Sequence, residues 1–225
     1  IPSTSGEKKV IAELCLRKMK ELSYDQIFID KIGNVVGIIE GTGDGKNIMF
    51  NSHLDHVDPG DYCNWLYDPY GGVIADGYIH GRAASDVKAG MAAQIYTPEL
   101  LRRAGIKLRG RLMFTGVVQE EPAEMFGMKY LVENTLPEKN FPFNLMISSE
   151  ATSLNVFIGH RGRVEMEVTT TGRTSHGSAP WRGINAVYKM LKVIERVQAL
   201  ADGLPEHDFL GKASIALTNI NCSPG

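Results

Sequence analysis

The chain has 225 residues, 43% of them apolar and 22% charged, and its 24 lysine and arginine residues against 26 acidic residues leave a formal charge of −2. This balance argues against binding to nucleic acid or to an anionic membrane, because both partners select a basic excess or a basic run. The three cysteines are too scattered for a disulfide framework or a cysteine zinc site. No apolar run approaches the roughly 18 residues of a membrane span, and we expect no secretory leader. We therefore expect a cytoplasmic globular protein of one or two domains.

The first part of the sequence alternates helical and β-like patterns. Thr4 lies three residues before Glu7, which has the form of a capping box and predicts a helix over residues 7–22. Residues 56–82 are rich in Pro-Gly, Gly-Gly and Asp-Gly pairs, which predict a long ordered loop crossed by a short hairpin. The strands predicted between these two segments are residues 26–29, 34–40 and 47–52.

A second helical pattern runs from Asp86 to about Arg103. The Thr97-Pro98 pair interrupts it and predicts a kink or a fresh helix start with Thr97 as the cap, because proline removes a helical hydrogen bond. The elements predicted after it are a strand at 110–118, a helix at 124–134 and a strand at 144–149. Strands that alternate with helices predict an α/β fold, with a mostly parallel sheet and helices on both of its faces.

The pattern changes after residue 160. We place a domain boundary at Gly159–Gly162, which divides the chain into residues 1–160 and a smaller α+β part, residues 161–225. The elements predicted in the second part are a half-exposed strand at 163–170, an amphipathic helix at 184–200 and a strand at 213–220.

Acidic and histidine side chains follow the predicted strands. His53 follows residues 47–52, Glu120 and Glu121 follow 110–118, Glu150 follows 144–149, and Asp86 opens a helix. In an open α/β sheet, ligands bind outside the carboxyl ends of the strands, so these residues should meet there. One histidine with four carboxylates needs cationic counter-charge, and imidazole with carboxylate ligands suits zinc, with cobalt or manganese as alternatives.

The spacing of these residues suggests separate tasks. Asp55 lies two residues after His53, on the same side of an extended segment, so its carboxylate is a candidate acceptor for the free ring N–H of His53. Glu120 and Glu121 are adjacent and would repel each other unless they act differently. One can bind metal while the other serves as the general base.

Five motifs then carry a resemblance to a known family. In chain order they are His53-Leu54-Asp55, Gly81-Arg82-Ala83-Ala84-Ser85-Asp86-Val87-Lys88-Ala89-Gly90, Gln119-Glu120-Glu121, Ser149-Glu150-Ala151 and Gly172-Arg173-Thr174-Ser175-His176. Their order resembles the co-catalytic zinc metallopeptidase and deacylase family of acetylornithine deacetylase, succinyl-diaminopimelate desuccinylase, aminoacylase and glutamate carboxypeptidase. The resemblance implies a zinc-peptidase-like catalytic domain over residues 1–160 and the first half of a lid or dimerisation domain over 161–225.

The resemblance also implies a role for each residue. His53 and Glu150 would bind one metal ion, Glu121 would bind the other, and Asp86 would bridge both. Glu120 would be the general base, acting on a metal-bridging hydroxide. The bond cleaved would be an amide of an N-acyl amino acid or a small peptide.

Two further roles follow from the same resemblance. Asp55 would orient His53, and His176 would reach the active site of a second subunit in a homodimer and stabilise the oxyanion. The family takes one more metal-ligating histidine from near its C-terminus, but the histidines after Glu150 are His160, His176 and His207. We therefore expect a fragment of a longer chain, and a catalytically incompetent fragment or metal-binding relic remains the alternative to an enzyme.

Some residues near these motifs differ from the family pattern and are not expected to bind metal. His56 stands where the family usually has a hydroxyl residue, and we interpret it as structural. Ala83 and Ala89 stand where the family usually has glycine, which would alter loop geometry without removing a ligand.

Overall fold

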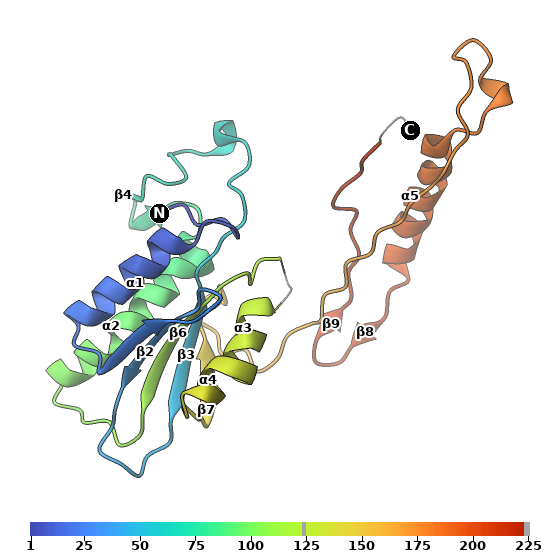
Figure 1. Cartoon of the computed structure of the whole chain (residues 1–225). Helices are drawn as coiled ribbons and strands as arrows, with labels where there is room; N and C mark the ends of the chain where they lie inside the picture. Colours follow the sequence, from blue (N-terminus) through green and yellow to red (C-terminus); the bar gives the residue numbers. More distant parts are fainter. Residues whose placement is uncertain (123–124, 223–225) are drawn as a thin grey trace. The chain divides into compact units, whose positions relative to one another are not determined.

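The computed structural model describes residues 1–122 and 125–222. The chain divides into two compact units, Ile1–Asn155 and Val156–Gly225 (Figure 1). The predicted boundary after residue 160 lies a few residues beyond this division. The assignment of a catalytic domain and a lid to the two parts stays a prediction.

The first unit is built on a five-stranded sheet with the order β1-β2-β6-β3-β7. Its strands are β1 Gln26–Ile29, β2 Val35–Ile39, β3 Ile48–His53, β6 Leu112–Val117 and β7 Leu145–Ser148. β3 pairs in parallel with β6 and β7, whereas β2 is antiparallel to β1 and β6. The short turn after β1 permits only an antiparallel partner, so the sheet is mixed.

Helices cover both faces of the sheet, as predicted (Figure 1). The helical segments are α1 Lys9–Glu21, α2 Ala89–Arg103, α3 Phe126–Tyr130, η3 Leu131–Thr135 and α4 Leu136–Glu138. α1 and α2 pack in one core cluster that contains Val35 and Phe114. Val36 and Met113, their neighbours along the strands, belong to the opposite cluster with η3 and α4. Consecutive strand residues point to opposite faces, which is why nearly unbroken apolar strands fit between two helical layers.

Two predicted helix boundaries are wrong. Thr4 does not cap α1. It forms a β-bridge with His56, and α1 begins at Lys9 with no side-chain cap. Pro98 lies inside a continuous α2, and the hydroxyl of Thr97 donates to the carbonyl of Ala93 at 2.8 Å instead of capping a new helix. The predicted start of the next helix, Glu124, lies outside the described residues, and α3 begins at Phe126.

The long loop over 56–82 is ordered and carries the predicted hairpin. A single 3₁₀ turn, η1, spans Tyr62–Asn64, and β4 (Val73–Ala75) pairs with β5 (Tyr78–His80). Aromatic contacts support it: the guanidinium of Arg82 lies 5.0 Å from the ring centre of Trp65.

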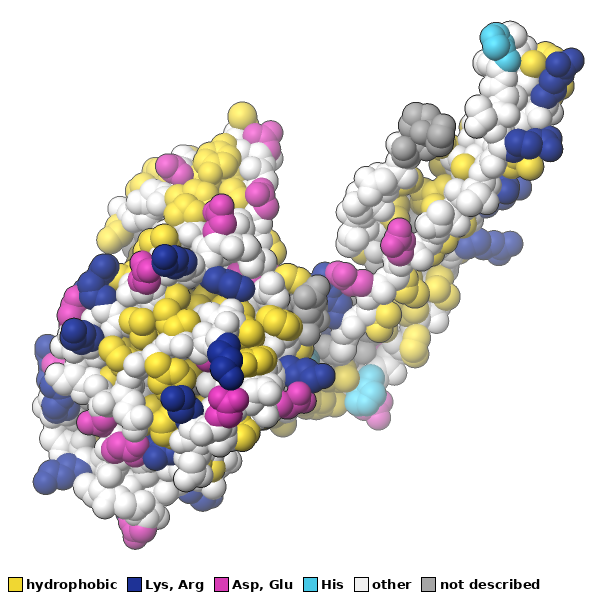
Figure 2. Space-filling model, viewed as in Figure 1, with side chains coloured by type: hydrophobic (Ala, Val, Ile, Leu, Met, Phe, Trp, Pro, Cys, Tyr) yellow, Lys and Arg dark blue, Asp and Glu magenta, His cyan; other side chains and the backbone are white. Residues whose placement is uncertain are grey.

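The second unit contains α5 (Ala186–Asp202), whose first turn is capped by the side chain of Asn185. Its other elements are η4 Pro180–Arg182, β8 Glu206–His207 and β9 Gly211–Lys212. The strands predicted at 163–170 and 213–220 are absent from the described residues. The alternating apolar residues of the first segment, such as Val164 and Met166, are exposed instead of packed. Hydrophobic side chains are visible at the surface of this unit (Figure 2).

β7 forms an edge of the five-stranded sheet, since no described strand pairs with its outer side. Its Leu145, Met146 and Ile147 side chains are exposed. Among the described residues, none of the helices is both long and apolar enough to span a bilayer.

Candidate metal centre

The candidate ligands follow from how the strands end. β3 ends at His53, and β6 ends at Val117, three residues before Glu120. Asp86 lies in the turn of η2 (Ala84–Lys88) that leads into α2. Because β3 and β6 run in parallel, their carboxyl ends deliver these side chains to the same edge of the sheet.

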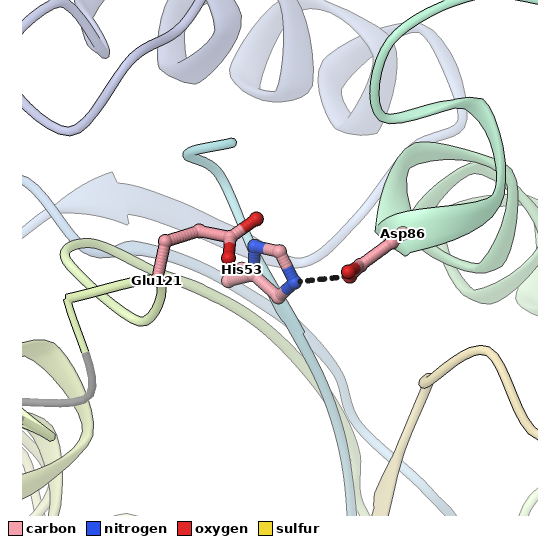
Figure 3. Close-up of side chains that lie close together, drawn as sticks. All are labelled: His53, Asp86 and Glu121. Carbon is pink, nitrogen blue, oxygen red and sulfur yellow. Dashed lines mark hydrogen bonds and ion pairs between the residues drawn. The ribbon is translucent and has the colours of Figure 1, made fainter. Parts of the chain in front are cut away.

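Three of the predicted metal ligands form one group (Figure 3). Each of His53, Asp86 and Glu121 offers a ligand atom, and these atoms lie within 4.8 Å of one another. Nε2 of His53 is 3.0 Å from an oxygen of Asp86. His53 is buried, Glu121 is half-buried and Asp86 is exposed, so the group opens to solvent on one side. This placement agrees with a cation site, and the metal-binding roles stay predictions.

The other nitrogen of His53 has a defined partner. Nδ1 lies 2.9 Å from the backbone carbonyl of Asp55. A carbonyl oxygen can only accept, so Nδ1 carries a proton and Nε2 is the atom available to a metal. Burial lowers the pKa of His53, but the carboxylate of Glu120 and hydrogen bonds to Asp55 and Asp86 outweigh it and raise the pKa above its ordinary value.

The carboxylate of Asp55 acts on a different segment from the one predicted. Its nearer oxygen is 4.0 Å from Nδ1 of His53. The two oxygens accept the backbone N–H groups of Glu120 at 3.2 Å and Glu121 at 3.4 Å, and one also accepts the hydroxyl of Ser5 at 2.9 Å. Asp55 therefore orients His53 through its carbonyl and holds the acidic pair through its carboxylate.

Glu121 and Glu150 both have a pKa raised above the ordinary value of a glutamate. Partial desolvation is the largest cause of the raised pKa of Glu121, and the charge of Asp86 adds to it. The pKa of Glu150 is raised by partial desolvation and by the carboxylates of Glu120, Asp86 and Glu121, against the opposing effect of His53. Such a concentration of negative charge is relieved by a divalent cation, and a donor set of one imidazole with carboxylates suits zinc, cobalt or manganese.

Glu150 lies outside the compact group, although its charge acts on His53. The chain before it is held in place: the hydroxyl of Ser149 is 2.6 Å from that of Ser52, and its N–H donates to the carbonyl of Asn51 at 2.9 Å. A Cβ on Gly90 of α2 would lie 2.6 Å from the Cβ of Ser149, so α2 approaches this strand end as closely as a glycine permits.

The remaining histidines differ in their surroundings. His56 is buried, accepts the N–H of Ser3 at its Nε2 and pairs its Nδ1 with the carbonyl of Val57. Both ring nitrogens are used, so His56 has the structural role that we expected. His176 is an exposed residue of the second unit, with Nδ1 2.8 Å from the hydroxyl of Ser178. No described histidine other than His53 joins the metal group.

Two residues that support this site, Ser5 and Asn34, were not among the residues predicted from the sequence. The side chain of Ser5 reaches Asp55 across 50 positions of the chain. Asn34 contacts the chain on both sides of the acidic pair. Neither contact leaves a local pattern in a single sequence.

The sequence matches one family of known proteins. A model described as peptidase family M20/M25/M40 matches residues 49–209. The uncharacterized protein YgeY of Escherichia coli (strain K12) is 34% identical over 98% of this chain and 53% of its own length. The probable carboxypeptidase of Aspergillus terreus is 31% identical over 81% of this chain and 42% of its own. A succinyl-diaminopimelate desuccinylase of Nautilia profundicola is 28% identical over 81% and 51%. The chain thus spans about half the length of these relatives.

Solved structures agree on the fold. The M20 family metallo-carboxypeptidase Sso-CP2 of Sulfolobus solfataricus matches with a TM-score of 0.56 at 18% identity, over 66% of this chain and 34% of that one. Human carnosine dipeptidase 1 matches with a TM-score of 0.55 at 20% identity, over 68% and 34%. The match of the family model over most of the sequence shows that this chain belongs to peptidase family M20/M25/M40.

Proposed function

We propose that the protein is a metal-dependent hydrolase that cleaves an amide bond in an N-acyl amino acid or a small peptide. The observation that carries this proposal is the group of His53, Asp86 and Glu121, in a chain of this family, with Glu120 held beside it. Relatives named as a desuccinylase, a carboxypeptidase and a dipeptidase support hydrolysis of this class.

The proposed cofactor is a pair of divalent metal ions, with zinc first and cobalt or manganese as substitutes. His53 and Glu150 would hold one ion, Glu121 the other, and Asp86 both. When bound, the metal ions would lower the pKa of a water molecule and polarise the amide carbonyl.

The residues of the chain would carry out the proton transfers. Glu120 would accept a proton from the attacking water and return it to the leaving amine. Asp55 keeps Glu120 and Glu121 in place through their backbone N–H groups. In a homodimer formed through residues 161–225, His176 of one subunit would donate a hydrogen bond to the oxyanion in the site of the other.

The test of this proposal is Glu120→Gln in the full-length protein. We expect a folded protein with the metal content of the wild type and no detectable turnover of N-acetyl amino acids or dipeptides. Metal content is measured by plasma mass spectrometry and turnover by amine release. Glu133→Gln, a change of an exposed glutamate on η3, is the matched control and should keep full turnover. Undiminished turnover by Glu120→Gln would rule out Glu120 as the base.

One observation favours the alternative of an incompetent fragment or metal-binding relic: the described residues bring three ligands together, with a single histidine among them. Two metal ions per chain with turnover that a chelator removes would exclude the relic. A cytoplasmic location and a homodimer stay predictions. Sedimentation velocity of the wild type and of His176→Ala would test the dimer separately from the oxyanion role, because His176→Ala should lose turnover and remain a dimer.

A further inference from the structure

Asn34 lies in the turn between β1 and β2, and its side chain is fully buried. Its amide oxygen accepts the N–H of Val118 at 3.0 Å. Its amide nitrogen donates to the carbonyl of Gly127 at 2.9 Å and to the carboxylate of Asp30 at 2.9 Å. One acceptor and two donors are thus all used, which is a set of bonds that only an amide side chain can make.

These contacts lie on both sides of the acidic pair. Val118 comes directly before the segment that carries Glu120 and Glu121, and Gly127 belongs to the first turn of α3 that follows it. The two ends are in close contact, since a Cβ on Gly127 would lie 2.2 Å from the carbonyl oxygen of Val118. A single buried side chain therefore connects the start and the end of this part of the chain.

Asn34 is itself held by a rigid turn. One oxygen of Asp30 accepts the backbone N–H groups of Ile32, Gly33 and Asn34, at 3.0, 3.0 and 2.9 Å. The other oxygen accepts the hydroxyl of Thr135 at 2.8 Å in addition to the amide of Asn34. Networks in which each member is satisfied restrict the positions of their parts, so the turn is a fixed base for the contacts of Asn34.

We propose that Asn34 is a positioning residue that sets the place of Glu120 and Glu121 relative to His53. It does not touch this group and acts through Val118 and Gly127. Asp55 holds the same segment by the N–H groups of the acidic pair, so Asn34 and Asp55 fix it at different points. The catalytic consequence rests on the proposed function of Glu120, whereas the hold on the segment does not.

The test compares three variants of the full-length protein. Asn34→Asp keeps the size of the side chain and the acceptor for Val118, but it removes both donors and places a carboxylate against Asp30. Asn34→Ala removes all three bonds. Thr135→Val is the matched control, because it deletes one hydrogen bond of the same network without touching Val118 or Gly127.

Two measurements are made well below the unfolding temperature of each variant. In amide hydrogen exchange of the metal-free protein, both Asn34 variants should lose protection at the backbone N–H groups of Glu120 and Glu121. Asn34→Ala should also lose protection at the N–H of Val118, whose acceptor it removes, and Thr135→Val should keep the protection of all three. In metal-saturated turnover, kcat should fall on the order of 10–100-fold with KM nearly unchanged, the size expected for a small displacement of catalytic groups.

The outcomes separate a positioning role from a merely structural one. If both Asn34 variants only unfold at a lower temperature and keep wild-type exchange and kcat, the proposal is wrong. If the Asn34 variants fail to fold, Asp30→Asn replaces them. It weakens the hydrogen bond from the amide of Asn34 and can retain the side-chain oxygen that accepts the N–H groups of the turn. A reduced kcat of Asp30→Asn supports the proposal, and an unchanged kcat overturns it. Turnover retained by Glu120→Gln would count against the proposed function, while the exchange experiment would still judge the hold of Asn34.

Discussion

The carbonyl oxygen of Asp55, and not its carboxylate, accepts the hydrogen bond from Nδ1 of His53 at 2.9 Å. The carboxylate is left to accept the N–H groups of Glu120 and Glu121. One residue thus connects β3, which delivers the histidine, to the segment after β6, which delivers the acids. The two connections use different atoms and can be separated by mutation.

Asp55→Ala removes the carboxylate and keeps the carbonyl. We expect the Nδ1–H signal of His53 in proton NMR to persist while turnover falls about 10–100-fold, because the acidic segment loses its support. Ser5→Ala is the milder comparison: it removes one of three bonds to the same carboxylate and should cost about 1 kcal/mol of stability with a smaller loss of turnover. Loss of the His53 signal with unchanged hydrogen exchange at Glu120 and Glu121 would contradict this division of tasks.

Glu121→Gln tests the metal group directly. In the wild type, the N–H of Val57 donates to the carboxylate of Glu121 at 3.3 Å. The glutamine amide keeps an oxygen that can accept this N–H, but the substitution removes a negative charge from the ligand set. We expect cobalt or zinc affinity, measured by isothermal titration calorimetry, to fall at least about tenfold. Glu133→Gln should leave the titration unchanged, and an equal affinity in both variants would exclude Glu121 as a ligand.

The metal-free protein should lose stability as the pH rises. Glu121 and Glu150 have pKa values raised above 4.5, and His53 has a pKa raised above 6.5. A raised pKa means that the folded state holds the proton more tightly than the unfolded chain, so this stabilisation is complete below the unfolded pKa and is lost as the pH rises through the folded one. The loss begins above pH 4.5 for the glutamates and above pH 6.5 for the histidine.

Thermal unfolding in the presence of a chelator measures this effect. The double variant Glu121→Gln, Glu150→Gln is the control that removes the two glutamate contributions. The Tm of the wild type should fall relative to that of the double variant as the pH rises, and an added divalent cation should reverse the difference. A wild-type Tm that gains on the double variant over this range would contradict the raised pKa values of Glu121 and Glu150.

Gly90→Ala should disturb the strand end that carries Glu150. The new Cβ would lie 2.6 Å from the Cβ and 2.8 Å from the hydroxyl of Ser149. Alanine favours a helix by about 1 kcal/mol over glycine, but we expect a net loss of about 1–3 kcal/mol from overpacking, read from urea unfolding midpoints. Gly162→Ala, at a position with no heavy atom within 4 Å of the added carbon, should be close to neutral. A stabilising Gly90→Ala would mean that β7 moves away without strain.

Much of the first unit could be predicted because its signals are local. Buried strands followed by His53 or by Glu120 and Glu121 leave a short-range pattern, and parallel pairing of β3 with β6 then brings their ends together. The sequence could not predict that the carbonyl of Asp55, and not its carboxylate, would bind His53. The spacing of His53 and Asp55 is the same whichever of the two groups accepts the hydrogen bond.

The incorrect predictions have a common physical cause, which is that contacts between distant parts of the chain decide the local structure. Thr4 and Glu7 have the spacing of a capping box, but Thr4 pairs with His56, a contact that lies far along the chain. The alternation at 163–170 predicts a strand, yet a strand needs a partner, and no described segment pairs with it. Asn34 carries no apolar period or motif, and its importance is visible only when Val118 and Gly127 are placed around it.

The outer side of β7 leaves backbone N–H and C=O groups without a strand partner among the described residues, next to exposed Leu145, Met146 and Ile147. An exposed apolar edge strand of this kind is a template for β-pairing with another chain. Concentrated samples of these 225 residues should therefore aggregate through β7. Met146→Lys should keep them in solution, because a charge at the strand edge opposes intermolecular pairing.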